Sequence, residues 1–268
     1  HGREDKEVLI STNICHPSMA NNELSGPVIA MALAEWLRSV GDLRYSYRFV
    51  FVPETIGAIV FLADNLKHLR EKVVAGYVVT CAGDDGPYGL MPSRNGDTLA
   101  DRAALHALRH HGPIENLVRY SFLDRGSDER QYCSPGVDLP VCSVTRSKYG
   151  TYPEYHTSLD DLSVISPAGL QSTIEAYAKM LWLIENNHVW LANQPCEPQL
   201  GRYGLYPTLS GTGAARPGRR LADFLAYADG SADYLQICET IGADGVALLD
   251  QIAALHREDL IRKAEDAE

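Results

Sequence analysis

Residues 7–40, EVLISTNICHPSMANNELSGPVIAMALAEWLRSV, decide the fold of this chain. The apolar run Glu7–Thr12 predicts a buried strand, and the polar stretch Asn13–Glu23 predicts a loop at its carboxyl end. Ser25 is expected to cap a helix that runs to Val40 with its apolar residues on one stripe. A buried strand that leads through a loop into a helix is the repeating unit of an α/β sheet.

The same alternation continues along the chain. Further strands are predicted at Tyr45–Pro53, Gly76–Cys81 and Leu139–Thr145, and helices at Ala58–Leu69, Thr98–His110 and Pro167–Asn187. This order indicates a mostly parallel sheet covered by helices on both faces. Such sheets bind ligands outside the carboxyl ends of their strands. Because His16, Glu54 and Asp84 each follow a strand end, we expect a functional site at that edge.

The last part of the chain has a different composition. Proline and glycine are frequent after residue 193, so we predict a main domain over 1–193, a linker over 194–218 and a small domain over 219–268. Three short helical patterns lie in the small domain: Leu221–Ala228, Tyr234–Ile241 and Ala243–Leu255. Their arrangement resembles a winged helix-turn-helix.

A DNA-binding role for this small domain is disfavoured. The helix in the recognition position, Ala243–Leu255, contains Asp244 and Asp250 but no lysine or arginine. Phosphate contacts need cations at that place. A structural or protein-contact module is therefore the preferred interpretation.

Composition bounds the remaining possibilities. The 268 residues are 45% hydrophobic and 22% charged, which suits one large core. The formal net charge of -11 argues against binding nucleic acid or an anionic membrane. The charged first residues do not resemble a signal peptide, and the six cysteines form no CxxC pair. A cytoplasmic location is expected.

Two separated histidine motifs indicate a metal site. Residues 152–161, YPEYHTSLDD, hold His156 between an aromatic residue and small hydroxyls, and Cys15-His16-Pro17 follows the first strand. Histidine is the commonest metal ligand, and nearby carboxylates can fix its tautomer. The alternative is a surface loop with one hydrogen-bonded histidine. For Cys15, a small buried residue at a strand end is the more probable interpretation than a metal ligand.

Together these motifs resemble the zinc aminopeptidase and glutamate carboxypeptidase superfamily. The similarity rests on His16, the helix entry NNELSG (21–26), PETIG (53–57), GSD (126–128) and YPEYH (152–156). It is greatest with an uncharacterised aminopeptidase-like branch that carries a C-terminal winged helix. The resemblance implies an α/β fold of the zinc exopeptidase (phosphorylase/hydrolase-like) type, with a mostly parallel mixed sheet sandwiched by helices and a small winged-helix domain.

The resemblance also implies that the N-terminal part of the family fold precedes residue 1. The chain is therefore expected to be a fragment or a short form. An exposed sheet edge left in this way would favour a homodimer.

The resemblance assigns roles to individual residues. His16 corresponds to the first histidine ligand, His156 to the last, and Glu54 to the general base. Tyr155 corresponds to a tyrosine that donates a hydrogen bond to the tetrahedral intermediate. In that scheme zinc activates water, a carboxylate takes the proton and a phenol stabilises the oxyanion.

Three family ligands are replaced in this chain. Asn22 stands where the bridging aspartate is expected, Thr55 replaces a ligand glutamate, and Cys81 replaces an acid. Amide and hydroxyl groups are weak zinc ligands, so a two-zinc site is not expected. The prediction is a single zinc held by His16, His156 and one carboxylate.

Glu23 is the preferred third ligand, Asp128 is the next candidate and Asp84 follows. The alternative for Glu23 is a first-turn acid that complements the helix dipole. For Asp128 the alternative is an orienting acid or a loop cap.

Arg94 and Arg130 are candidate substrate-binding residues, because a guanidinium pairs bidentately with carboxylates and phosphates. Arg125 and Arg146 could do the same. For Arg94 the preferred alternative is a plain loop at a helix entry. Ion pairing within an acidic protein explains Arg125, Arg130 and Arg146 equally well.

The leading hypothesis is a zinc-dependent hydrolase that cleaves an amide bond of a small peptide or an amino-acid conjugate. The second is a binding or scaffold protein that kept the peptidase fold without catalysis. A DNA-binding regulator is the least favoured of the three.

Overall fold

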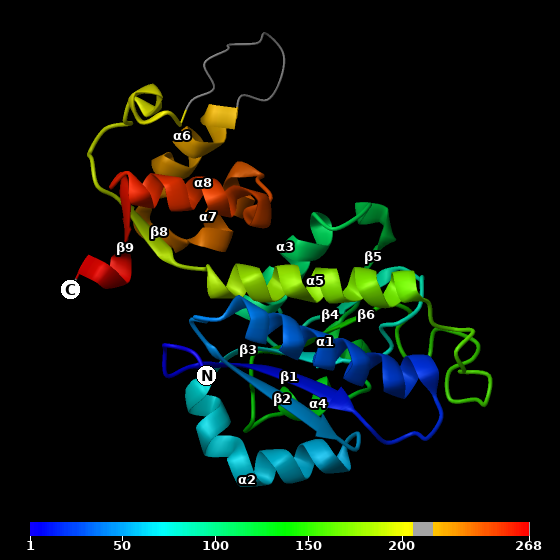
Figure 1. Ribbon diagram of the computed structural model, residues 1–268. Helices are drawn as coiled ribbons and strands as arrows, with labels where there is room; N and C mark the ends of the chain where they lie inside the picture. Colours follow the sequence, from blue (N-terminus) through cyan, green and yellow to red (C-terminus); the bar gives the residue numbers. More distant parts are fainter. Residues whose placement is uncertain (206–216, 268) are drawn as a thin grey trace. The chain divides into compact units, whose positions relative to one another are not determined.

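The computed structural model describes residues 1–205 and 217–267, and these divide into two units, His1–Glu185 and Asn186–Glu268. The first unit is built on one six-stranded sheet (Figure 1). Its strands are β1 Glu7–Asn13, β2 Ser46–Val52, β3 Val73–Val79, β4 Tyr88–Met91, β5 Leu117–Arg119 and β6 Val141–Thr145. Their spatial order is β2-β1-β3-β6-β4-β5.

The sheet is mixed but mostly parallel, as predicted. Strand β1 pairs in parallel with both β2 and β3, and β3 pairs in parallel with β6. Strand β4 runs antiparallel to β6 and parallel to β5. The sequence pattern missed β4 and β5 because four and three residues are too few to show a strand period.

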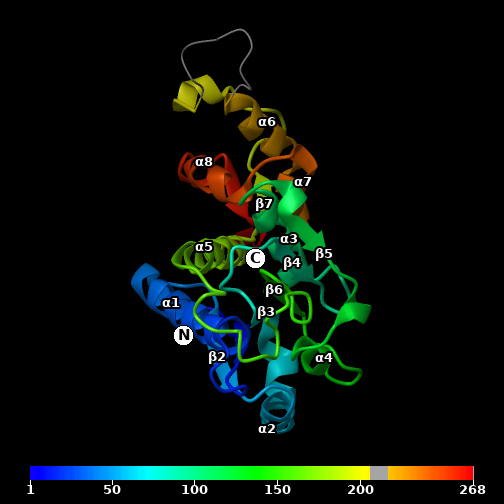
Figure 2. The same ribbon diagram turned by 90° about the vertical axis from the view of Figure 1, so that its right-hand side faces the viewer.

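Helices cover both faces of the sheet (Figures 1 and 2). On one face α1 Ser25–Val40 and α3 Leu99–Arg109 both pack against α5 Pro167–Glu185. On the other face α2 Ile56–Lys72 contacts the short helix α4 Glu129–Tyr132. Both faces are thus shielded from water, and this explains why β1 is buried at every position.

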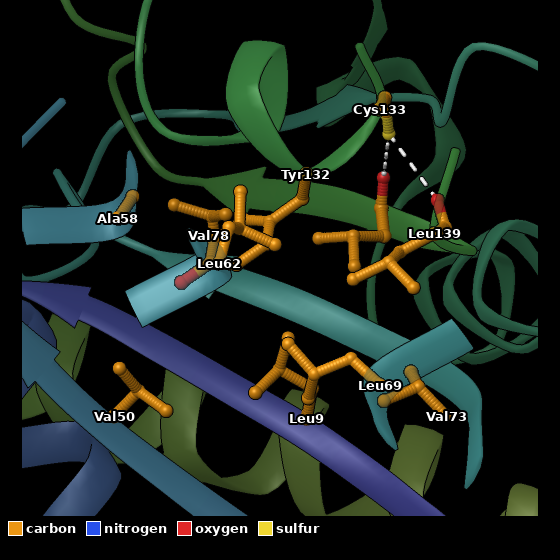
Figure 3. Close-up of a cluster of buried hydrophobic side chains, with 11 residues drawn as sticks. Leu9, Val50, Ala58, Leu62, Leu69, Val73, Val78, Tyr132, Cys133 and Leu139 are labelled. Atoms are coloured by element: carbon orange, nitrogen blue, oxygen red, sulfur yellow. Dashed lines mark hydrogen bonds between the residues drawn. The ribbon is translucent and has the colours of Figure 1, made fainter. Parts of the chain in front are cut away.

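The core under α2 and α4 is a cluster of buried side chains (Figure 3). Leu9 and Val78 come from the sheet, Leu62 and Leu69 from α2, and Tyr132 from α4. Truncating one such side chain to alanine costs about 2–5 kcal/mol of stability. This packing fixes the sheet, whose strand ends carry the polar residues described below.

The entry to α1 differs from the prediction. Ser25 does not cap the helix, because a π-helical turn, Ala20–Leu24, runs directly into it. The Ser25 hydroxyl instead donates to the carbonyl oxygen of Asn21 at 2.5 Å. At α3, in contrast, Thr98 and Asp101 form a capping box that sets the first turn. The predicted cap at Ser25 was therefore wrong, because the helical backbone begins five residues earlier.

The second unit is the winged-helix domain that the sequence predicted. It contains α6 Pro217–Tyr227, α7 Tyr234–Ile241 and α8 Gly245–Arg257, with an antiparallel sheet of β7 Val189–Ala192, β8 Asp229–Asp233 and β9 Ile261–Lys263. Helix α8 extends past Leu255, so its last turn includes Arg257, which the predicted recognition segment left out. Short 3-10 turns lie at Ile114–Asn116, Phe122–Asp124, Leu200–Tyr203 and Ala264–Ala267.

The division between the units lies after Glu185, earlier than the predicted boundary at residue 193. The reason is that β7 pairs with β8 and β9, which fixes residues 189–192 in the second unit. Residues 206–216 of the predicted 194–218 linker, and residue 268 of the predicted last domain, lie outside the described residues. Among the helices of the described ranges, none combines the length and the apolar character that a membrane span requires.

Candidate metal centre

Two distant histidines meet beside the carboxyl end of β1. The ring centroids of His16 and His156 lie 4.6 Å apart, and their planes are tilted by 30°. His16 lies in the loop after β1, and His156 lies in the loop after β6. The structure therefore brings together the two side chains on which the predicted metal site depends.

Cys15, His16 and Glu23 form a compact group, here called the Cys15 cluster. One potential ligand atom from each residue lies within 4.8 Å of the other two. His16 Nδ1 is 2.9 Å from Glu23 Oε1, and Cys15 Sγ is 3.3 Å from His16 Nδ1. The backbone N–H of Cys15 donates to Glu23 Oε2 at 2.8 Å, which ties the loop to the π-helical turn. Nitrogen, oxygen and sulfur ligands in this proximity suit a zinc ion.

Asp160 holds the π-helical turn in place. Its carboxylate accepts from the backbone N–H groups of Asn21 at 2.7 Å and Asn22 at 3.0 Å. Its backbone oxygen accepts from Ala20 N at 2.8 Å, and the side chain is buried. A carboxylate satisfies the free N–H groups at a helix start and complements its dipole. The YPEYHTSLDD segment is thereby fastened to the turn that carries Glu23.

A second group of polar residues contacts Glu23 through Asn22. It consists of Asn22, Cys81 and Tyr152 and is here called the Asn22 cluster. Asn22 Nδ2 donates to Glu23 Oε1 at 2.9 Å, and the Cys81 thiol donates to Asn22 Oδ1 at 3.4 Å. Burial raises the pKa of the Cys81 thiol to about 12, so it stays protonated. Tyr152 lies 4.0 Å from Cys81 Sγ and donates to Asp160 at 3.0 Å. This cluster is neutral and its polar groups are already hydrogen bonded.

Glu54, the predicted general base, follows β2 and lies next to the Cys15 cluster. Its backbone N–H donates to Cys15 Sγ at 3.3 Å. Its carboxylate accepts from Ser127 Oγ at 2.7 Å and from Asn13 Nδ2 at 3.4 Å. One carboxylate oxygen is therefore oriented by buried donors from β1 and from the loop before α4.

Asp128, the second candidate ligand, lies at the N-cap of α4 and contacts the backbone beside Glu54. Like His156, it is not one of the three residues of the Cys15 cluster. Its Oδ1 accepts from Thr55 N at 2.7 Å, while Oδ2 is buried with no hydrogen-bond partner among the described residues. Burial raises the pKa of Asp128 to about 7, opposed by the Thr55 hydrogen bond and reinforced by the charge of Glu54. Its visible role is to hold the backbone beside Glu54.

Tyr155 stacks on His156 with ring centroids 3.9 Å apart. Burial raises the pKa of its phenol, and the negative charges of Glu54 and Glu23 reinforce that shift. The phenol therefore stays protonated and can donate a hydrogen bond near these groups.

Two residues of the site have a strained backbone. Both Thr55 and His156 have positive φ, 64° and 57°, which costs backbone energy and is typical of functional sites.

Each of the two predicted substrate arginines has a protein partner. Arg94 forms an ion pair with Asp138 at 2.7 Å, and both side chains are substantially exposed. Arg130 Nη2 donates to Thr55 Oγ1 at 2.5 Å, so the Thr55 hydroxyl is occupied. Asp84, the last candidate ligand, accepts hydrogen bonds from Asn21, Gly86 and Ser147. Ion pairing and loop closure account for the visible contacts of all three.

Sequence analysis undervalued Cys15, Ser127 and Asp160. Cys15 was interpreted as a small buried residue, but it is only partly buried and its thiol lies within the cluster. Its position next to His16 was the available signal. Ser127 and Asp160 act through contacts with Glu54 and with the turn at Asn21, and these long-range contacts leave no local pattern in the sequence.

Comparison with known proteins places both units. Residues 1–187 match the family described as "Domain of unknown function (DUF4910)", and residues 188–263 match a winged helix-turn-helix family. The chain is 38% identical over 264 residues to a Clostridium acetobutylicum protein named "Putative polysaccharide biosynthesis protein with aminopeptidase-like domain". This alignment covers 97% of the chain and 59% of that protein, so the chain spans about three-fifths of its relative.

Two solved structures show the fold. A "putative peptidase" from Clostridium acetobutylicum superposes with a TM-score of 0.88 at 35% identity, over 98% of this chain and 58% of that one. A zinc aminopeptidase from Bacillus subtilis superposes with a TM-score of 0.58 at 16% identity, over 67% of this chain and 46% of that one. The larger unit thus has the aminopeptidase-like fold that the sequence motifs indicated.

Proposed function

Since the chain belongs to the family described as domain of unknown function (DUF4910), and its fold is aminopeptidase-like, we propose that it is a zinc-dependent hydrolase. Its reaction would be cleavage of an amide bond in a peptide or an acyl-amino conjugate. The observation that carries this proposal is that His16 contacts both the Glu23 carboxylate and the His156 ring, beside the loop that holds Glu54.

The donors of the Cys15 cluster fit a single zinc ion. His16 and Glu23 of this cluster would hold it together with His156, whose ring lies 4.6 Å from the His16 ring, and a position would remain for water as in catalytic zinc sites. Cys15 is a further possible ligand, although burial raises the pKa of its thiol when no metal is bound. A bound zinc would supply Lewis-acid chemistry, because it polarises a carbonyl and acidifies water.

A second zinc ion does not fit. The position that would need a bridging carboxylate holds the Asn22 amide, whose oxygen accepts from the protonated Cys81 thiol. The hydroxyl of Thr55 is bound by Arg130. Neutral groups that already satisfy one another offer little to a second cation.

The chain's own residues would move the proton and stabilise the charge. Glu54 would accept the proton of the attacking water on its carboxylate and pass it to the leaving amine. Ser127 and Asn13 hold one Glu54 oxygen, which leaves the other free to face the water. The protonated phenol of Tyr155 would donate to the oxyanion as it develops.

The test combines metal content with one substitution. Protein purified without chelator should contain about one zinc per chain by elemental analysis. Glu54→Gln should retain that zinc and lower the rate of amide hydrolysis by about a hundredfold or more on a panel of aminoacyl and N-acyl-amino anilides. Glu71→Gln, which removes an exposed carboxylate from α2, serves as the matched control and should keep full activity.

The alternative function, a binding or scaffold protein on the same fold, is favoured by the neutral Asn22 cluster. Absence of zinc even after it is supplied, with no hydrolysis of any anilide, would support this alternative. Loss of zinc on Glu54→Gln would instead make Glu54 a ligand and overturn its assignment as the base.

A further inference from the structure

A separate cavity of about 640 Å³ lies in the first unit. It is partly open to solvent and is lined by the start of β4 and the loop before it, the end of α3 and the segment after it, the residue that follows β6, and α5. Leu108 and Leu117 provide apolar walls, while Tyr88, His111, Arg146 and Ser172 provide polar ones. A cavity that combines apolar walls with a few convergent polar groups is a candidate small-molecule site.

Arg146 is held in place but is not neutralised. Its guanidinium carbon lies 4.2 Å from the centroid of the Tyr88 ring, and its backbone N–H donates to Cys81 O at 2.8 Å. Its Nε is buried and has no hydrogen-bond partner, and no carboxylate in residues 1–205 or 217–267 forms an ion pair with it. Arg146 is half-buried, and a buried nitrogen is normally hydrogen bonded, so its Nε has unused capacity to donate to an anion.

The hydroxyl groups of Ser172 and Tyr88 line the same cavity, and their hydrogen bonds follow from the protonation of His111. Lys179 Nζ lies 3.2 Å from His111 Nδ1, and an ammonium can only donate, so Nδ1 accepts. Burial lowers the pKa of His111, reinforced by the charge of Lys179, and the neutral ring then carries its hydrogen on Nε2. That N–H donates to Ser172 Oγ at 3.1 Å, and Ser172 Oγ is 2.8 Å from Tyr88 Oη.

The hydroxyl groups of Ser172 and Tyr88 form one hydrogen bond with each other, so only one of their two hydrogens is used. Whichever of Ser172 and Tyr88 donates to the other, the second hydroxyl hydrogen has no acceptor among the described residues. The cavity wall thus offers a free O–H donor as well as the Arg146 cation. A ligand that supplies acceptor oxygens and a negative charge would satisfy both.

Two acidic residues near Arg146 limit how much negative charge a ligand of this cavity can carry. Asp85 and Glu115 also line the cavity, and Asp85 Oδ1 is already used to accept from Ser166. Their negative charges disfavour a doubly charged phosphate more than a singly charged carboxylate. The apolar walls suit a hydrophobic body attached to the anionic group.

We propose that this cavity binds a small organic carboxylate, whose oxygens accept from Arg146 and from the Tyr88 and Ser172 hydroxyl pair. This assignment is independent of the proposed zinc chemistry, because none of these side chains belongs to the Cys15 cluster or the Asn22 cluster. It identifies a second ligand site with its own chemical class.

The experiment is a titration of the whole chain, followed by NMR at constant ionic strength, with benzoate, benzamide and phenyl phosphate as probes. Benzoate should bind at least about tenfold more tightly than the uncharged benzamide, because it adds charge-assisted hydrogen bonds. It should also bind more tightly than phenyl phosphate. Tighter binding of phenyl phosphate would overturn the carboxylate assignment and identify a phosphate site.

Substitutions locate the binding. Arg146→Gln should weaken benzoate binding by at least about tenfold, and Arg146→Lys should weaken it less because the charge is kept. The matched control is Arg125→Gln, since Arg125 is also stacked on an aromatic ring, Phe122 at 4.9 Å, but is exposed and lines no cavity described here. It should leave the affinity unchanged.

Equal affinity for benzoate and benzamide, or equal affinity of the wild-type chain and Arg146→Gln for benzoate, would overturn the proposal. If Arg146→Gln unfolds, the benzoate affinities of Arg146→Lys and Ser172→Ala are compared with that of the wild-type chain instead. Ser172→Ala removes one hydroxyl of the pair and should also weaken benzoate, but not benzamide.

Discussion

The Cys15 cluster and the Asn22 cluster share one atom as a contact, Glu23 Oε1, yet they have opposite properties. His16 presents an imidazole whose side chain is 34% exposed, and it lies 2.9 Å from that oxygen. Asn22 is 5% exposed, and its amide lies 2.9 Å from the same oxygen. One side carries ligands that an ion can reach, whereas the other is a buried, neutral hydrogen-bond network.

The proposal of a single zinc ion instead of two rests on this difference. In the Asn22 cluster each polar group is satisfied by a protein neighbour, so no charge is left to attract a cation. In the Cys15 cluster a carboxylate, an imidazole and a thiol compete for the same contacts, and a metal ion would organise them.

The strongest test of this contrast removes the imidazole. His16→Ala should weaken zinc binding by at least about a thousandfold, since it deletes one of three protein ligands. Zinc affinity measured by competition with a chelator gives the result. His110→Ala, at an exposed position after α3, is the control and should leave the affinity unchanged. Full zinc binding by His16→Ala would remove the metal site from the Cys15 cluster.

Asp128, a buried acid outside both clusters, should make the free energy of unfolding depend on pH. The pKa of Asp128 is about 7 in the folded chain against an ordinary value of 3.8, so the folded state holds a proton that the unfolded state releases. The free energy of unfolding should therefore fall as the pH rises from about 4 to about 7, by up to about 4 kcal/mol. Asp128→Asn cannot titrate and should flatten this dependence.

Denaturant unfolding at pH 5 and pH 7.5 measures the effect of Asp128. Asp64→Asn, at an exposed position on α2, should reproduce the wild-type slope and serves as the control. An unchanged slope in Asp128→Asn would mean that the carboxyl group is already ionised in the folded chain at pH 5.

A smaller loss of stability is expected when a charge is introduced into the neutral Asn22 cluster. Asn22→Asp places a buried carboxylate beside Glu23 and the protonated Cys81, and should lower stability by about 1–3 kcal/mol near pH 7. Zinc content should remain near one per chain, because Cys81 and Thr55 are still poor ligands. A rise to two zinc ions per chain, measured by elemental analysis, would show that Asn22 alone closes the second position.

The smallest expected change concerns Cys15. If the thiol supports the site without binding the ion, Cys15→Ser should weaken zinc binding by about tenfold, in the range of residues that orient metal ligands. The chelator competition used for His16→Ala gives the value. A loss as large as that for His16→Ala would make Cys15 a ligand and redraw the Cys15 cluster as a four-ligand site.

Much of the fold could be predicted from local patterns. The helix of residues 25–40 and the strands near residues 7, 46 and 141 occur close to where the sequence placed them, because each has a clear apolar period. The winged-helix unit was recognisable from its three helices. The strands β4 and β7 were missed, because four residues show little periodicity and their pairing partners lie far away in the chain.

The candidate site divides in the same way. Motifs identified His16, Glu54, Tyr155 and His156, and the structure brings these four residues to one region. They could not show that Asp128 binds the Thr55 backbone instead of joining His16, or that Arg94 pairs with Asp138. These contacts depend on where separate strand ends meet.

By itself, the sequence determined the chemical groups available, the alternation of strands and helices, and an amide at position 22. Only the tertiary structure decided that Cys81 and Glu23 satisfy that amide, that Cys15 joins His16, and that Arg146 lines a cavity with an Nε that has no hydrogen-bond partner among the described residues. The physical reason is that local propensity acts over a few residues. Hydrogen bonding and burial at a site depend on side chains from distant segments, whose proximity is set by packing of the whole sheet.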